Sequence, residues 1–266
     1  MKRYRWLLGC CLFLSIGMLW AADEPDLRML QQKAAQSRDM EGYVGVCKYL
    51  YQTEENPELL LLYADSIHQL ATKSKKPEQL VEYYIWASEG NFIKGDFQQG
   101  YALKRKAIAL AEKAGLKFAI SQSCCDMGYY CNVDARYDSA RYYFRKGLEA
   151  GEDLSEAGEA CRTMLTNYAS SFLFEGKTDS ALVYTIRASE RSAADKDTAM
   201  LIENLNQLGT IYRRKKDLEN CIANFEQALH LCELRGNHNA VAFIYGNIAT
   251  AYCDWNRPGD AIPFSE

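Results

Sequence analysis

The chain has 266 residues, of which 48% are hydrophobic and 12% aromatic, so it can bury a large core. Residues 1–22 hold three basic and no acidic residues, which leaves 28 lysines and arginines against 35 aspartates and glutamates from residue 23 onward. This acidic balance argues against nucleic acid as a direct ligand, because neutralising phosphates requires a basic surplus. The chain has only five prolines and no linker-like stretch, which favours one elongated array over two globules.

The first 22 residues have the layout of a signal peptide. Basic residues lie within the first five positions, and the uncharged, mostly apolar run Trp6–Trp20 follows. Ala21 and Ala22 are small residues at a position suited to cleavage. We therefore expect the chain to be exported across the inner membrane and to be periplasmic. If the segment is not cleaved, it anchors the chain in the membrane, facing the periplasm.

Residues 23–80 show helical periodicity but do not follow the frame of the later chain. The pattern predicts helices near 25–37, 40–53 and 57–73. The third helix has one predicted apolar face, made of Leu59, Leu62, Tyr63, Ile67, Leu70 and Ala71. We interpret 23–80 as a degenerate helical repeat or capping region, and the sequence leaves the pairing of its helices open.

Residues 81–266 repeat with a period of about 40 residues. Three aromatic residues recur at this interval: Phe172, Tyr212 and Tyr252. A small residue follows each of them after nine positions: Ala181, Cys221 and Ala261. Two earlier copies fit the frame less well, with Asn91 and Cys131 at the aromatic position and Gly100 and Ala140 at the small one. A small residue where two helices cross, beside an aromatic that fills the adjoining hole, predicts stacked helix pairs. We count about five units, the last incomplete.

This pattern resembles the tetratricopeptide repeat (TPR). The resemblance covers residues 81–266 and is most specific at Leu208, Gly209, Tyr212, Asp217, Phe225 and Ala228. The period exceeds the usual 34 residues, which implies longer helices, as in kinesin-light-chain-like members of the family. The resemblance implies an all-α fold, a right-handed α-solenoid of TPR-like antiparallel helix pairs.

In TPR arrays the first helices of the pairs line a concave groove that binds ligands. Transferred to this sequence, the resemblance predicts a groove of mixed hydroxyl, amide and aromatic side chains. Its residues are Tyr129, Asn132, Thr166, Ser170, Phe174, Asn206, Thr210 and Arg213. We expect such a surface to bind an extended peptide or a helix of another protein. Arg213 also begins a basic run that ends at Lys216, which is typical of a helix C-terminus.

The sequence gives no support for catalysis, a metal site or a cofactor. His68, His230 and His238 lie in different units and lack a metal-type partner at helical spacing. A nucleophilic pairing of Cys47 with His68 lacks an orienting group and an oxyanion site. We expect most of the eight cysteines after residue 22 to be buried and unpaired, although export leaves disulfides open. We therefore expect a protein that binds other proteins and is not an enzyme.

Two functional interpretations remain from the sequence. A signal segment followed by long-period TPR units resembles the exported sensory input regions of bacterial signalling proteins. The alternative is a free-standing assembly scaffold of the cell envelope without a signalling output. The second helix of the last unit has only begun at Asp260, so we also expect a longer natural chain, or self-association through that end.

Overall fold

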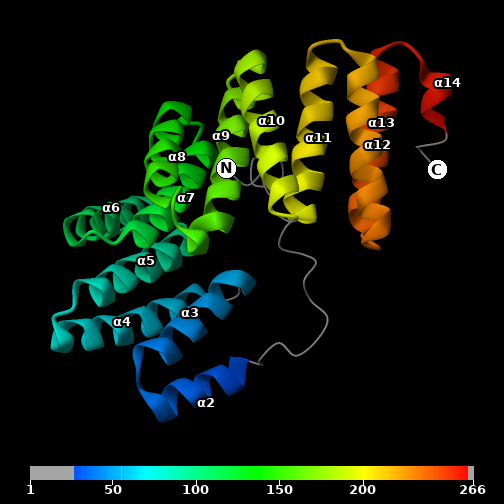
Figure 1. Ribbon diagram of the computed structural model, residues 1–266. Coiled ribbons are helices and arrows are strands. Elements are labelled where there is room, and N and C mark those ends of the chain that lie inside the picture. Colours follow the sequence, from blue (N-terminus) through cyan, green and yellow to red (C-terminus); the bar gives the residue numbers. More distant parts are fainter. Residues whose placement is uncertain (1–26, 55, 263–266) are drawn as a thin grey trace. The chain divides into compact units, whose positions relative to one another are not determined.

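The computed structural model describes residues 27–54 and 56–262, and the predicted signal segment 1–22 lies outside them. These residues form α-helices joined by short turns, with no strand among them (Figure 1). The helices of the first half are α2 (Leu27–Ser37), α3 (Met40–Thr53), α4 (Pro57–Ser74), α5 (Pro77–Lys94), α6 (Phe97–Ala114) and α7 (Lys117–Val133). The second half holds α8 (Tyr137–Gly151), the 3-10 turn η1 (Ser155–Ala157), α9 (Gly158–Phe174), α10 (Thr178–Ala194), α11 (Thr198–Arg214), α12 (Leu218–Leu234), α13 (His238–Asp254) and α14 (Pro258–Ala261).

The all-α prediction is confirmed, and consecutive helices pack against one another as antiparallel pairs. The chain divides into two compact units, and the division passes through α7 and α8. In the described residues, the N-terminal unit comprises 27–127 and 145–158, and the C-terminal unit comprises 128–144 and 159–262. Along the described part of the chain, no helix is long and apolar enough to cross a membrane.

The three helices predicted in residues 23–80 are found within two residues of their expected ends. Their starts are set by local capping: Asp39 accepts a hydrogen bond from the amide of Gly42 at the start of α3, and Asn56 accepts one from Leu59 at the start of α4. Pro57 occupies the first turn of α4, where its missing amide hydrogen costs nothing.

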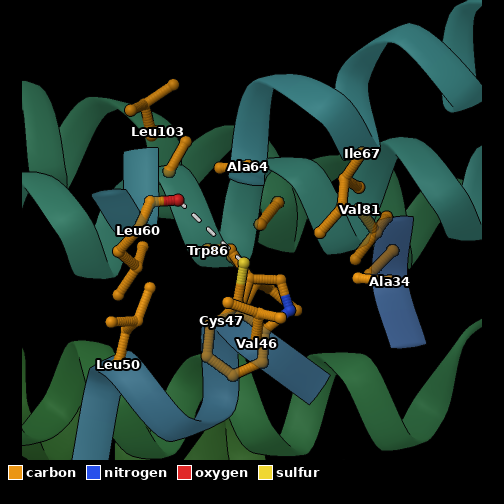
Figure 2. Close-up of a cluster of buried hydrophobic side chains, with 14 residues drawn as sticks. Ala34, Val46, Cys47, Leu50, Leu60, Ala64, Ile67, Val81, Trp86 and Leu103 are labelled. Carbon is orange, nitrogen blue, oxygen red and sulfur yellow. Dashed lines mark hydrogen bonds between the residues drawn. The ribbon is translucent and has the colours of Figure 1, made fainter. Parts of the chain in front are cut away.

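The predicted apolar face of α4 is rotated from the observed one. Leu60, Ala64, Ile67 and Ala71 are buried, whereas Leu62 is 61% exposed. The reason is that α4 packs against both α3 and α5, so its buried stripe must meet two helices. Figure 2 shows this core, in which Leu60 and Ala64 lie beside Val46 and Cys47 of α3 and Trp86 of α5.

The 40-residue frame is also present in the turns between the helices of a pair. The backbone amide of the residue after each turn bonds to the carbonyl five residues earlier, and the acceptors are Asn91, Cys131, Phe172, Tyr212 and Tyr252. These are the aromatic-frame positions of the sequence. In each turn one residue has a positive φ: Gly95, Ala135, Gly176, Lys216 and Asn256. This is the αL helix ending for which glycine is usual, so the non-glycine copies keep the turn at some conformational cost.

The predicted small residues lie at helix crossings and are buried: Ala140, Ala181, Cys221 and Ala261. Two glycines of first helices face phenylalanines of second helices in the same pair. A Cβ at Gly128 would come within 2.3 Å of Phe144, and one at Gly209 within 2.6 Å of Phe225. Both rings are fully buried, so these crossings leave no room for a side chain at the glycines.

The position of Phe144 and Phe225 holds a polar residue in the other two complete pairs. It is Lys104 in α6, 40 residues before Phe144, and Thr185 in α10, 40 residues before Phe225. The Lys104 ammonium contacts Glu89 of α5 and lies 2.9 Å from Asp126 Oδ2 of α7. The Thr185 hydroxyl lies 3.0 Å from Gln207 Oε1 of α11, and Gln207 Nε2 donates to the Ser170 hydroxyl of α9 at 2.6 Å. The same three repeat positions thus carry an ionic set in one unit and a neutral set in the other.

Candidate functional site

The eight residues predicted to line a groove all lie in the C-terminal unit, on first helices α7, α9 and α11. The structure brings them to neighbouring helices but gives them different environments. Asn132, Thr166 and Ser170 are buried. Tyr129, Asn206, Thr210 and Arg213 are partly exposed, and the side chain of Phe174 is 38% exposed.

The three buried residues bond to neighbouring first helices. Asn132 Nδ2 donates to the Asn167 carbonyl at 3.0 Å, and the Thr166 hydroxyl lies 2.9 Å from Asn204 Oδ1. Ser170 accepts the bond from Gln207 described above. Because a ligand must reach a side chain to contact it, the structure assigns these three residues to holding the helices together. Their predicted place on an open groove wall is therefore corrected.

Three of the five exposed members lie on one stripe of α11. Asn206, Thr210 and Arg213 are spaced by four and three residues, which places them on one helical face. This face is tied to α13, since Asn247 Nδ2 donates to Asn206 Oδ1 at 2.7 Å and Arg213 Nε lies 3.7 Å from Asp254 Oδ2. We call this surface of α11 and α13, together with the exposed side chains of first helices α7 and α9, which include Tyr129 and Phe174, the first-helix face. Its part in binding a ligand stays a prediction.

Sequence reasoning missed Glu203 on α11 and Phe243 and Asn247 on α13. Glu203 lies three residues before Asn206, and Phe243 lies four residues before Asn247, so all four lie on the first-helix face. The period relates two of them, since Phe243 lies 40 residues after Glu203. On α9 the prediction placed residues 166 and 170 on the groove. In the structure these two are buried, and Thr163 and Asn167 are more exposed.

The electrostatics of this face centre on Glu203. Burial, together with the nearby carboxylate of Asp197, raises the pKa of its carboxyl to about 8. Asp197 itself is held by Arg162, whose Nε lies 2.9 Å from Asp197 Oδ2 and whose Nη1 lies 2.9 Å from Asp195 Oδ2. Arg191 also bonds to Asp195, and the two arginines lower the pKa of that aspartate. Glu203 thus sits in a partly buried region whose arginines are engaged elsewhere.

Other chemistry finds little support in the described residues. No group of three or more histidines, cysteines or acidic residues among them is arranged to hold a metal ion. Seven of their eight cysteines are buried, as predicted, and none of the eight forms a disulfide. Burial raises the pKa of Cys47 to about 12, and His68 stacks on Tyr83 with ring centroids 4.3 Å apart. Cys47 is therefore a protonated core thiol, unsuited to act as a nucleophile.

A family model described as "Tetratricopeptide repeat" matches residues 197–266. The matched segment includes α11, α12 and α13, which hold the most specific repeat residues of the sequence. The comparison with curated proteins found no match.

Solved structures with TPR-like repeats resemble between 71% and 99% of this chain. The apo form of RapI has a TM-score of 0.71 and 10% identity, with 99% of this chain and 73% of that chain covered. A Rap protein complexed with Competence and Sporulation Factor gives 0.56 and 11%, with coverages of 99% and 75%. A putative kinesin light chain of Podosopora anserina with nearly identical TPR-like repeats gives 0.59 and 12%, with coverages of 71% and 92%. The recognition of long-period TPR-like repeats is thus confirmed, and at these identities the similarity concerns the fold alone.

Proposed function

We propose that this protein is a scaffold that binds an extended peptide, or an extended segment of a partner protein, on its first-helix face. The observation that carries the proposal is the bond between Asn206 and Asn247, which fixes two partly exposed amides on adjoining helices. Amides of this kind both donate and accept hydrogen bonds, as the backbone of an extended peptide requires. Because packing and side-chain bonds already hold them in place, little ordering is needed on binding.

Exposed aromatics on first helices of the same unit supply apolar contact. Phe174 of α9 and Phe243 of α13 are 38% and 37% exposed, and each is large enough to cover a ligand side chain. Exposed amide and aromatic side chains on successive helices suit a ligand that crosses several helices. One relative of the same fold is a Rap protein whose structure contains Competence and Sporulation Factor, which supports binding of a partner by such an array.

The biological setting remains part of the proposal. We propose that the chain is exported and that it acts as the sensory input region of a bacterial signalling protein, with binding as its task and no catalysis of its own. The signal-peptide layout of residues 1–22 supports export. Cell fractionation tests this point: we expect the chain in the periplasm or membrane fraction, and recovery of the full-length chain in the cytosol would contradict it.

The binding proposal is tested by affinity selection from random hexapeptides with the purified chain. We expect a subset of peptides to be retained. Alanine at Tyr129, Phe174 and Arg213 together should reduce retention while the helical circular dichroism signal stays unchanged. Tyr142→Ala is the matched control, since Tyr142 is an exposed aromatic on second helix α8. Unchanged retention by the triple variant, or equal loss in the control, would refute binding on the first-helix face.

A further inference from the structure

Glu203 is a carboxylate without an evident partner on the first-helix face. It is partly buried, and within the described chain it makes no hydrogen bond or ion pair. Acidic side chains are seldom removed from water without a compensating cation or donor. Its neighbours one and two turns further along α11 are Asn206 and Thr210, and neither is charged. The carboxylate is therefore available to a charged group that comes from outside the chain.

The basic side chains near Glu203 are already engaged. Arg162 forms its bonds to Asp195 and Asp197, and Arg191 shares Asp195. Arg213 lies ten residues further along α11 and is paired with Asp254 of α13. These arginines are therefore engaged by aspartates, and none of them bonds to Glu203 within the described chain.

An aromatic ring lies at the same level as Glu203 on the adjoining first helix. Short turns reverse the chain before and after α12, so α11 and α13 run parallel. The bond from Asn247 to Asn206 fixes their register, and Glu203 and Phe243 lie three and four residues before the bonded asparagines. Both side chains therefore lie one turn from the bond, towards the N-termini of their helices. The ring of Phe243 is 37% exposed.

We infer that Glu203 and Phe243 form a subsite for an arginine or lysine side chain of the bound peptide. A guanidinium or ammonium group can bond to the carboxylate while its charge or its apolar stem rests on the ring of the phenylalanine. The occupant is a cation because no group of the described chain offsets the cost of ionising this carboxyl: its pKa of about 8 leaves it largely protonated at pH 7 in the free chain, and a bound cation favours the ionised form. The subsite rests on the proposed function. It further specifies that one residue of the bound peptide is positively charged.

The test uses three pools of blocked synthetic hexapeptides, in which one position is fixed as arginine, citrulline or glutamate and the others are random. Citrulline keeps the shape of arginine without its charge. We expect the arginine pool to bind the purified chain about tenfold more tightly than the citrulline pool, as for a charge-assisted hydrogen bond. Glu203→Gln should remove this difference, and Phe243→Ala should reduce the affinity for the arginine pool severalfold. Glu219→Gln, an exposed glutamate on α12, is the matched control and should change nothing.

The outcomes separate the subsite from the function on which it rests. Equal binding of the arginine and citrulline pools, or an undiminished preference in Glu203→Gln, overturns the subsite while leaving peptide binding intact. If none of the three pools binds, both the subsite and the proposed function are overturned. Because glutamine matches glutamate in shape, circular dichroism of Glu203→Gln should equal that of the wild type, which excludes unfolding as the cause of a loss.

Discussion

The ionic set of the N-terminal unit and the neutral set of the C-terminal unit join three helices at the same repeat positions, with different side-chain chemistry. Glu89, Lys104 and Asp126 occupy the repeat positions that Ser170, Thr185 and Gln207 occupy 81 residues later. In both sets the second-helix residue contacts a residue of the next first helix 22 positions further along the chain. The backbone frame is therefore shared, and the side chains decide whether charge or neutral hydrogen bonds join the helices.

The difference teaches that the TPR-like frame fixes where a contact occurs and leaves its chemistry open. Burial lowers the pKa of Lys104, but Asp126 and Glu89 together raise it above its usual value, so the ammonium stays charged. That set depends on all three members, because a buried charge that loses its partner is costly. In the neutral set each member loses only a hydrogen bond when its partner is removed. The two units should therefore respond differently to equivalent substitutions.

The largest effect is expected for Lys104→Met. The substitution leaves the carboxylates of Glu89 and Asp126 without their cation in a buried site. We expect the free energy of unfolding of the N-terminal unit to fall by about 3–5 kcal/mol. Urea denaturation followed by circular dichroism measures this. Lys113→Met, on the exposed side of α6, is the control and should lie within about 0.5 kcal/mol of the wild type.

Copying the neutral set into the ionic positions sharpens the comparison. The triple variant Glu89→Ser, Lys104→Thr, Asp126→Gln removes the two carboxylates together with their cation. We expect it to regain at least half of the stability lost in Lys104→Met, about 2 kcal/mol, because no buried charge remains unpaired. The same denaturation experiment decides: a triple variant less stable than Lys104→Met would show that charge compensation is not the main role of the set.

Phe225 of α12 stands at the repeat position that Lys104 and Thr185 occupy in the ionic and neutral sets. Gly209→Ala tests how tightly its ring is packed. The new Cβ would come within 2.6 Å of the ring of Phe225, which is fully buried and has little room to move. We expect a loss of about 1–2 kcal/mol. Gly246→Ala is the matched control, since nothing lies within 4 Å of a Cβ there. That variant should be neutral or more stable, because alanine favours the helix.

A smaller effect is expected in the neutral set. Thr185→Val removes the hydroxyl that lies 3.0 Å from Gln207 Oε1 and keeps the shape of the side chain. We expect a loss of about 1 kcal/mol, well below that of Lys104→Met. Thr250→Val is the control, because Thr250 is exposed and its hydroxyl bonds only to the carbonyl of Gly246 in its own helix. Equal losses at Thr185 and Lys104 would contradict the distinction between the two sets.

The smallest effect concerns the pH dependence of stability at Glu203. Its pKa in the folded chain is about 8, above the usual 4.5, so the unfolded chain ionises first as the pH rises. Its contribution to stability is therefore full below pH 4.5 and is lost as the pH rises towards 8. Glu203→Gln should flatten this slope by an amount on the order of 1 kcal/mol, since the side chain is partly exposed. Thermal unfolding at pH 5 and pH 8 measures it, and identical slopes in both proteins would exclude the raised pKa.

The sequence predicts the fold well where a pattern repeats locally. Recurring residues such as Tyr212 and Cys221 define the helix pairs, because close helix crossings accept few residue types. Helix ends near residues 40 and 57 are predictable because Asp39 and Asn56 cap them through neighbouring amides. The buried face of α4 is less predictable, since it depends on which two helices pack against it.

The candidate site is less predictable because it depends on the rotation of each helix. A shift of one position moves a residue by about 100° around the helix, and this separates buried Thr166 from partly exposed Asn167. The ionic set was also missed, because the spacing of Lys104 from Glu89 and Asp126 has no meaning until three helices are placed together. The repeat period carries this information, since Lys104 stands at a phenylalanine position of the frame.

Photo-crosslinking tests the central claim, ligand binding on the first-helix face, most directly. A hexapeptide from the arginine pool, with a benzophenone in place of one random residue, is irradiated with the purified chain, and the linked residues are identified by mass spectrometry. The account predicts crosslinks to α9, α11 and α13 near Phe174, Asn206 and Phe243, and their loss when the unlabelled arginine pool is added. Crosslinks confined to the second helices α10 and α12, or spread evenly over the chain, would contradict it.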